Sequence, residues 1–255
     1  MTPDVVPAQE AVSVAPPSPS TMFSGDYETF REAAAHCEGY DSEAAAKAAQ
    51  VQLRQMMEAS PPTEIDGRFQ QVHSALCVVR DHLKAGRLSV LDIGGGAGNY
   101  FFRIQSLLAA EALDWSIVET SSLVAACSGL GAPFRYFDSI PARGSFDVAL
   151  ISGTLQYLAE PFEALRAAAK VSGWILLTRV PIRHGPTQFM VQTVPEHIYR
   201  GSMPIQVFCS DELSKALESI GSIELTWSVS LDDPAFPGMG VSNRGYLVRC
   251  RHVER

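Results

Sequence analysis

The sequence of 255 residues has no apolar run that approaches the roughly 18 residues needed to cross a membrane. It also lacks a basic cluster, since 20 lysines and arginines stand against 28 acidic residues, for a formal net charge of −8. A chain of this charge without a basic patch is a poor partner for DNA or an anionic membrane. We therefore expect a soluble globular protein that binds neither nucleic acid nor a membrane.

Cysteine is scarce and shows no pairing pattern. The five cysteines lie far apart and form no Cys-x-x-Cys pair, so neither a zinc site nor a disulfide framework is predicted. Lysine and arginine are absent before Arg31, and no continuous apolar segment precedes it. This pattern is typical of neither a secretory signal nor an organelle transit peptide, and it favours a cytoplasmic protein with no metal centre.

Proline and hydrophobic periodicity divide the chain into three parts. Residues 1–22 contain five prolines among small and polar residues, which predicts a disordered tail. Residues 23–86 show helical periodicity and predict an N-terminal helical cap. The periodicity is clearest in an apolar stripe at steps of three and four, made by Phe69, Val72, Leu76, Val79 and Leu83. Residues 87–255 are expected to form the main domain.

After residue 86, short β-rich runs alternate with helical stretches, the pattern of an α/β protein. LSVLDI (88–93), a helical stretch and DWSIVE (114–119) form a βαβ unit. Further strands are predicted at 134–137, 146–152, 173–180, 222–230 and 245–251. The apolar continuity of the middle strands indicates a Rossmann-like, doubly wound, mainly parallel sheet of seven strands. The last two strands are expected to form a C-terminal antiparallel hairpin.

A glycine-rich loop follows the first of these strands. Residues 92–98 read DIGGGAG, and missing Cβ atoms at the start of a helix let a ligand approach backbone amides. The dinucleotide fingerprint fails because its sixth position is Asn99, which disfavours a nicotinamide dehydrogenase. The Asp92 carboxylate would repel a pyrophosphate but suits a cofactor that carries an ammonium group, such as S-adenosylmethionine. Glu119, at the end of the next strand, is placed to accept both ribose hydroxyls. The alternative is a tight turn with an exposed acid.

These motifs give the chain a family resemblance. It resembles a class I S-adenosylmethionine-dependent methyltransferase over about residues 88–251, with LDIGGGAG and IVE as the first and second motifs. It also resembles a group of bacterial proteins classed as methyltransferases. That likeness rests on segments in the same order: FSGDY (23–27), GYD (39–41), SGTLQYL (152–158), RVP (179–181) and VQTVP (191–195). The chain departs from the group at Ala97 and Met203, where Leu and Tyr are usual.

The resemblance implies methyl transfer and assigns a cofactor site. The glycines would line the methionine and ribose parts of the cofactor, Glu119 would hold the ribose hydroxyls, and Asp138 the adenine amine. Asp138 lies in FDSIP and is equally suited to start a turn. The full set of expected cofactor-binding residues is Asp92, Gly94, Gly95, Gly96, Gly98, Glu119, Asp138, Ser152 and Gln156.

Acceptor residues are expected at the carboxyl ends of the fourth and fifth strands. SGTLQYL has neither the N/D-P-P-Y tetrad of methyltransferases acting on bases nor an acid at Ser152, which disfavours a metal-dependent catechol-type site. In this segment Gln156 and Tyr157 are candidates to contact cofactor or acceptor, and a capping or packing role is the alternative. Tyr157 is also a candidate catalytic residue.

RVPIRHGPTQF (179–189) is expected to form a polar loop beside the crevice. His184 is the candidate general base, because histidine titrates near neutral pH, and an exposed histidine without a role is the alternative. Arg179 and Arg183 would hold a carboxylate or phosphate of the substrate. Further along, His197 is a second catalytic candidate and Tyr199 a second substrate-binding candidate.

Two hypotheses of function follow. The leading one is a methyltransferase that forms an O-methyl or N-methyl product on a small-molecule or glycan-precursor acceptor, with the N-terminal helices covering the site. The other is a cofactor-binding pseudoenzyme or scaffold, since a nucleotide loop implies binding and not turnover. The residues leave the acceptor undetermined, and a homo-oligomer is left open.

Overall fold

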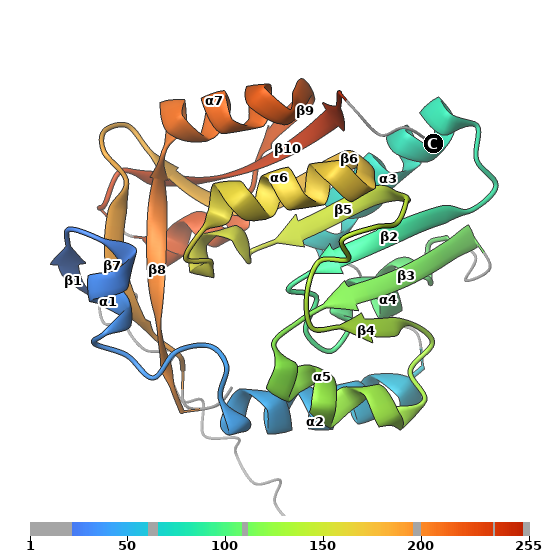
Figure 1. Ribbon diagram of the computed structural model, residues 1–255, viewed down its shortest axis with the longest axis horizontal. Coiled ribbons are helices and arrows are strands. Elements are labelled where there is room, and N and C mark those ends of the chain that lie inside the picture. Colours follow the sequence, from blue (N-terminus) through green and yellow to red (C-terminus); the bar gives the residue numbers. More distant parts are fainter. Residues whose placement is uncertain (1–21, 61–65, 109–111, 196–199, 237, 252–255) are drawn as a thin grey trace, which may run out of the picture.

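The computed structural model describes residues 22–60, 66–108, 112–195, 200–236 and 238–251 (Figure 1). The predicted disordered tail lies outside these residues except for Met22. Among the described residues no helix is both long and apolar enough to cross a membrane. In the same part of the chain, no three His, Cys, Asp or Glu side chains gather where they could hold a metal ion.

A curled sheet of ten strands forms the frame of the described chain (Figure 1). The strands are β1 (Phe23–Tyr27), β2 (Leu88–Ile93), β3 (Leu113–Val118), β4 (Arg135–Phe137), β5 (Phe146–Ser152), β6 (Ser172–Arg183), β7 (Gln188–Thr193), β8 (Ser202–Cys209), β9 (Gly221–Ser228) and β10 (Val241–Cys250). The parallel strands run in the order β4-β3-β2-β5-β6, which is the doubly wound order with its switch point between β2 and β5. Ligands bind such sheets at the carboxyl ends of the strands beside that point.

All seven predicted strands are present, and the C-terminal hairpin is confirmed, because β10 pairs antiparallel with both β9 and β6. The predicted count of seven is too low, since the described chain also contains β1, β7 and β8. β1 pairs antiparallel with β7, β7 pairs antiparallel with β8, and β8 runs parallel to the end of β6. Glycine or proline in or beside each of these three segments disguises them as cap or loop in the sequence.

The helices lie on both sides of the sheet. They are α1 (Phe30–Ala34), α2 (Glu43–Glu58), α3 (Gly67–Leu83), α4 (Asn99–Ile104), α5 (Ser121–Cys127), α6 (Pro161–Val171) and α7 (Ser210–Ile220), with short 3₁₀ turns η3 (Ser128–Leu130), η4 (Leu155–Tyr157) and η5 (Ser230–Ala235). The predicted stripe of α3 is confirmed at its centre, where Val72, Leu76 and Val79 are fully buried. Asp66 caps the helix by accepting hydrogen bonds from the backbone N–H groups of Arg68 and Phe69.

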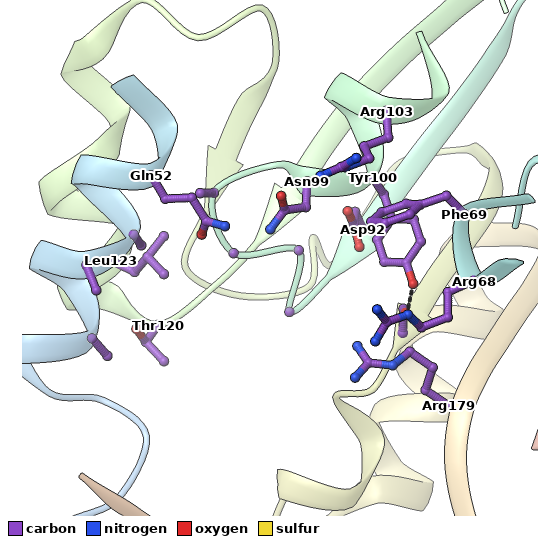
Figure 2. Close-up of a pocket in the computed structure, with 18 of the residues that line it drawn as sticks. Gln52, Arg68, Phe69, Asp92, Asn99, Tyr100, Arg103, Thr120, Leu123 and Arg179 are labelled. Atoms are coloured by element: carbon purple, nitrogen blue, oxygen red, sulfur yellow. Dashed lines mark hydrogen bonds between the residues drawn. The ribbon is translucent and has the colours of Figure 1, made fainter. Parts of the chain in front are cut away.

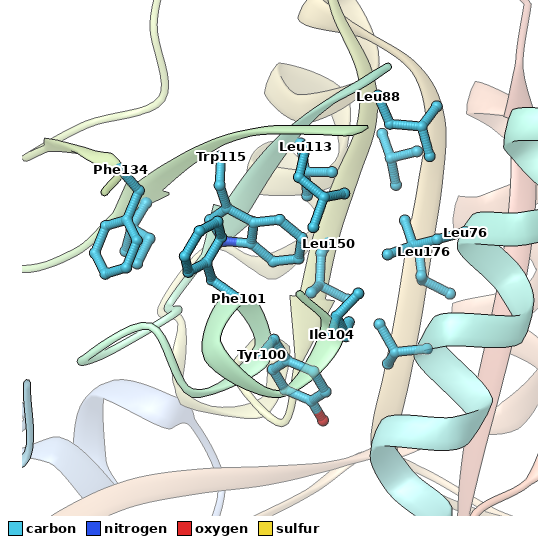
Figure 3. Close-up of a cluster of buried hydrophobic side chains, with 14 of the residues drawn as sticks. Leu76, Leu88, Tyr100, Phe101, Ile104, Leu113, Trp115, Phe134, Leu150 and Leu176 are labelled. Carbon is cyan, nitrogen blue, oxygen red and sulfur yellow. The ribbon is translucent and has the colours of Figure 1, made fainter. Parts of the chain in front are cut away.

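The segment 23–86 is not a purely helical cap. Its first residues form β1, and α3 packs into the main core with Leu88, Trp115, Leu150 and Leu176 (Figure 3). The other face of the sheet packs against α6 and α7. α2, the residues just before it and the start of α3 line the space at the carboxyl ends of the strands, where α2 packs beside α5 (Figure 1). The two packed faces hold the ends of β2 and β5 in fixed positions.

Candidate functional site

The glycine loop leaves β2 at the switch point and turns into α4. Gly94 has a φ of +73° and Gly96 a φ of +58°, a backbone region that favours glycine. A Cβ at Gly94 would lie 2.3 Å from the side chain of Thr154, so the loop packs closely on the segment after β5. A Cβ at Gly96 would meet no atom within 4 Å, so this glycine borders open space.

Glu119 closes the loop from the end of β3. Its Oε1 accepts a hydrogen bond from the Gly96 N–H at 3.0 Å, and its Oε2 accepts one from the Thr120 N–H at 3.0 Å. The side chain is only 6% exposed, and this burial raises the pKa of Glu119 while the two N–H donors lower it in part. Each carboxylate oxygen has a second lone pair, so Glu119 can accept two further hydrogen bonds at the loop.

Asp92 is the buried acid beneath the loop. It is 1% exposed, and its Oδ2 accepts a hydrogen bond from Trp115 Nε1 at 3.2 Å. Burial raises the pKa of Asp92 to about 8, although the Trp115 hydrogen bond opposes this shift. At neutral pH the carboxyl group is therefore mostly protonated, and a cation placed beside it would favour the ionised form.

Two cavities meet at this loop. The larger, of about 480 Å³, is lined by the loop, α2, the start of α3, α4 and β6, and it includes Arg68, Tyr100, Arg103 and Arg179. Figure 2 shows Arg68 and Arg179 pointing into the space below the loop, opposite Gln52, Leu123 and Thr120. The smaller cavity, of about 360 Å³, is lined by the ends of β2, β3 and β5. Tyr40, Gly94 and Thr120 line both.

Most of the expected cofactor residues lie at these cavities. Asp92, Gly94, Gly95, Gly96 and Ser152 line the larger cavity, and Gly94, Glu119 and Asp138 line the smaller. The Ser152 hydroxyl shares a 2.6 Å hydrogen bond with the Tyr100 hydroxyl. Asp138 is exposed and accepts a hydrogen bond from Ser139, so its carboxylate makes the local contact expected of a turn residue while it also borders the cavity.

Two of the expected residues are buried within the fold. Gly98 begins α4, and a Cβ there would lie 2.4 Å from the Phe134 ring. Gln156 is buried in η4, and its Oε1 accepts no hydrogen bond from the described residues. Neither residue belongs to the walls of the two cavities.

Four of the segments on which the expected resemblance to the bacterial group rests contact one another. Tyr157 of SGTLQYL donates a hydrogen bond to Gln192 of VQTVP at 2.6 Å, and its ring stacks on Tyr40 of GYD at 6.3 Å. FSGDY forms β1, which pairs with β7 through Phe23 and Gln192. Tyr157 therefore lines the smaller cavity and also ties η4 to the added strands.

The structure departs most from the sequence prediction at residues 179–189, where a polar acceptor-side loop is expected. RVPIRHGPTQF is not a loop beside the crevice, because β6 continues through Arg183 before it turns into β7. Ser152 pairs with Thr178, so His184 lies six residues beyond the level of the site, roughly 20 Å along an extended strand. His184 is exposed, and Arg183 donates to Gln188 Oε1 at 2.6 Å. Of this group only Arg179 lines the larger cavity, while His197 and Tyr199 lie outside the described residues.

The structure adds site residues that the sequence did not single out. Arg68 reaches the larger cavity from the start of α3, and Arg103 and Tyr100 reach it from α4. Arg68 donates to Asp66 at 3.0 Å and to Asp232 at 3.4 Å. Arg103 lies over the Phe69 ring, 5.0 Å from its centre. Nothing in the local sequence marks Arg68, because only the packing of α3 on the sheet brings it to the cavity.

The fold and the loop define an α/β protein with a site at the switch point of a doubly wound sheet. The sequence matches no known family model, and no curated protein matches it. Solved structures similar in fold include the N-terminal domain of EvdMO1 with SAH bound, at 16% identity and a TM-score of 0.49, covering 80% of this chain and 97% of that one. CalS10, an amino pentose methyltransferase from Micromonospora echinaspora, has 12% identity and a TM-score of 0.44 over 77% of this chain and 95% of that one.

Human N-acetylserotonin methyltransferase in complex with SAM is a third similar structure. It has 12% identity and a TM-score of 0.48 over 81% of this chain and 55% of that one.

Proposed function

We propose that the chain is an S-adenosylmethionine-dependent methyltransferase acting on a small-molecule or glycan-precursor acceptor. The observation that carries this proposal is the Glu119 carboxylate, held against the glycine loop by the N–H groups of Gly96 and Thr120. This arrangement leaves acceptor lone pairs at the loop for a vicinal diol such as ribose. An acid at the end of this strand also binds ribose in dinucleotide sites, and Asn99, at the sixth position of the dinucleotide fingerprint, is what separates this site from them.

The two cavities suit the two ends of such a cofactor. Asp138 borders the smaller cavity, where it would accept from the adenine amine. Asp92 lies in the wall of the larger cavity, where it would face the methionine ammonium. Arg68 and Arg103 are the cations on the α3 and α4 side that would hold the methionine carboxylate. The space beside Gly96, here called the open cradle of the loop, is filled by no side chain, because a Cβ at Gly96 would meet no atom within 4 Å.

In this proposal the chain's main task is alignment. The sulfonium cofactor supplies an activated methyl group, so the protein has to orient the acceptor in line with it. The described walls of the two cavities contain no histidine, and His184 is too far along β6 to act there. Tyr100 and Ser152, joined by their hydrogen bond, provide hydroxyl groups in the wall of the larger cavity, which Asp92 also lines. α2 lines the larger cavity and would exclude water from that side of it.

The proposal is tested by cofactor binding and then by turnover. Glu119→Ala should weaken binding of S-adenosylhomocysteine by roughly 1.5–3 kcal/mol, the size of charge-assisted hydrogen bonds. Glu163→Ala is the matched control, because Glu163 pairs with Arg166 on the surface of α6. Equal affinity of both variants and the wild type in calorimetry would remove the cofactor assignment. Binding without turnover on a panel of hydroxyl and amine acceptors, followed by mass spectrometry, would instead favour the scaffold alternative.

A further inference from the structure

Arg179 has an unusual backbone for a residue within a strand. Its φ is +61°, and among the described residues only Lys84, at the end of α3, is another non-glycine with positive φ. The pairing of β6 with β10 shifts here, since Leu177 faces Tyr246 and Val180 faces Arg244. Thr178 and Arg179 therefore stand opposite Gly245 alone, which is a β-bulge. Bulges redirect side chains, and strained residues gather at functional sites.

A neighbouring glycine makes room for the redirected side chain. A Cβ at Gly153 would lie 3.0 Å from Arg179 Nη1 and 3.2 Å from its Cζ, so the guanidinium lies directly against this glycine. A Cβ at Gly245 would lie 2.1 Å from the Trp227 ring, so a larger residue opposite the bulge would displace that ring. Gly153 thus accommodates the Arg179 guanidinium, whereas Gly245 accommodates the Trp227 ring.

The guanidinium of Arg179 is bonded on one side only. Its Nε donates to Asp232 Oδ2 at 2.8 Å, and the other oxygen of Asp232 accepts from Arg68 Nη1 at 3.4 Å. The Nη1 and Nη2 groups of Arg179 make no hydrogen bond to a described residue, although the side chain lines the larger cavity. Arg68 differs, because both of its Nη groups already donate to carboxylates.

We infer that the free Nη1 and Nη2 groups of Arg179, here called the Nη fork, bind an oxyanion of the methyl acceptor, which is a carboxylate or a phosphate. Asp232 orients this fork by accepting a hydrogen bond from Nε. The inference rests on the proposed function and gives it a substrate class. The planar fork matches both anions with two parallel hydrogen bonds. Arg179 approaches from β6 beside Arg68, with which it shares Asp232, and its Nη groups are the ones without a carboxylate partner among the described residues.

Anion binding to the protein saturated with S-adenosylhomocysteine tests the inference without turnover. Succinate and inorganic phosphate are titrated by calorimetry, with succinamide as the uncharged comparison. The wild type should bind one of the two anions, and the anion that binds more tightly identifies the acceptor's oxyanion as a carboxylate or a phosphate. Arg179→Gln should weaken that binding at least tenfold and change the S-adenosylhomocysteine affinity less than twofold. Arg179→Lys keeps the charge without the fork, so its anion affinity should lie between that of the wild type and that of Arg179→Gln. Asp232→Asn should also give an intermediate anion affinity.

Arg183→Gln is the matched control, because Arg183 lies on the same strand but donates to Gln188 outside the cavity. It should bind the anion as the wild type does. Equal anion binding by the wild type and both Arg179 variants would overturn the inference, as would a wild type that binds neither anion. A tenfold loss of S-adenosylhomocysteine affinity in Arg179→Gln would assign the fork to the cofactor instead. If the wild type binds no S-adenosylhomocysteine, the proposed function fails, and the same titration of the unloaded protein still tests the fork.

Discussion

Asp92 predicts a pH-dependent affinity for the cofactor. The free protein holds this buried carboxyl group mostly protonated at pH 7, because burial raises its pKa to about 8. A ligand ammonium beside it would bind to the ionised form and lower its pKa. Binding of S-adenosylhomocysteine should therefore release a proton, and affinity should increase with pH.

The size of the effect follows from the ionised fraction. With a pKa of about 8, roughly a tenth of the Asp92 carboxyl groups are ionised at pH 7 and roughly a hundredth at pH 6. The apparent affinity scales with the competent fraction, so it should increase about tenfold between pH 6 and pH 7. Close to one proton should be released per ligand at pH 7, a range in which the α-amino group of the ligand is still mostly protonated.

Calorimetry in two buffers of different ionisation enthalpy measures this proton release. Asp92→Asn should abolish both the release and the pH dependence between pH 6 and pH 7. Asp114→Asn on β3 is the matched control, since Asp114 is an exposed partner of Arg135. An affinity that stays constant from pH 6 to pH 7 in the wild type, with no proton released, would refute the pairing of Asp92 with an ammonium.

The pH dependence of protein stability tests the raised pKa of Asp92 independently of ligand binding. The folded-state pKa of Asp92 lies above its usual value of about 3.9, so the folded state binds this proton more tightly than the unfolded state does. The contribution of Asp92 to stability is therefore greatest below about pH 4 and is lost as the pH rises toward 8. Asp92→Asn should accordingly raise Tm more at pH 8 than at pH 5 in the ligand-free protein.

Three further changes probe other parts of the molecule. Gly96→Val should reduce S-adenosylhomocysteine affinity at least tenfold in calorimetry, because its side chain would occupy the open cradle and its φ disfavours a branched residue. His184→Ala should leave turnover unchanged from pH 6 to pH 9, since His184 lies beyond the site on β6, and a loss of a hundredfold would return it to catalysis. Leu76→Ala should lower the free energy of unfolding by about 2–5 kcal/mol in denaturant titrations, as a fully buried side chain of α3, whereas the exposed Val78→Ala should change it by less than about 0.5 kcal/mol.

The sequence predicted the central sheet well because its signals are local. LSVLDI and FDVALIS are short, continuous apolar runs with turn residues beside them, and they became the fully buried centres of β2 and β5. The glycine loop was equally predictable, because its glycine spacing and the acid at Asp92 form a local pattern that does not depend on distant residues. Glu119 followed because the end of the next parallel strand must lie beside the loop.

The acceptor side depends on pairing that no local pattern encodes. The segment around Arg183 contains proline, glycine and charged residues, which is typical of a loop, yet β10 pairs with it on one side and β8 on the other. That pairing carries His184 away from the cavity and leaves Arg179 at the bulge, so two residues five positions apart in the sequence have opposite outcomes. Arg68 enters the site through the packing of a helix more than a hundred residues earlier in the chain. A cofactor loop can therefore be recognised within a few residues, whereas the arginines that line the larger cavity come from β6, α3 and α4, which lie far apart in the sequence.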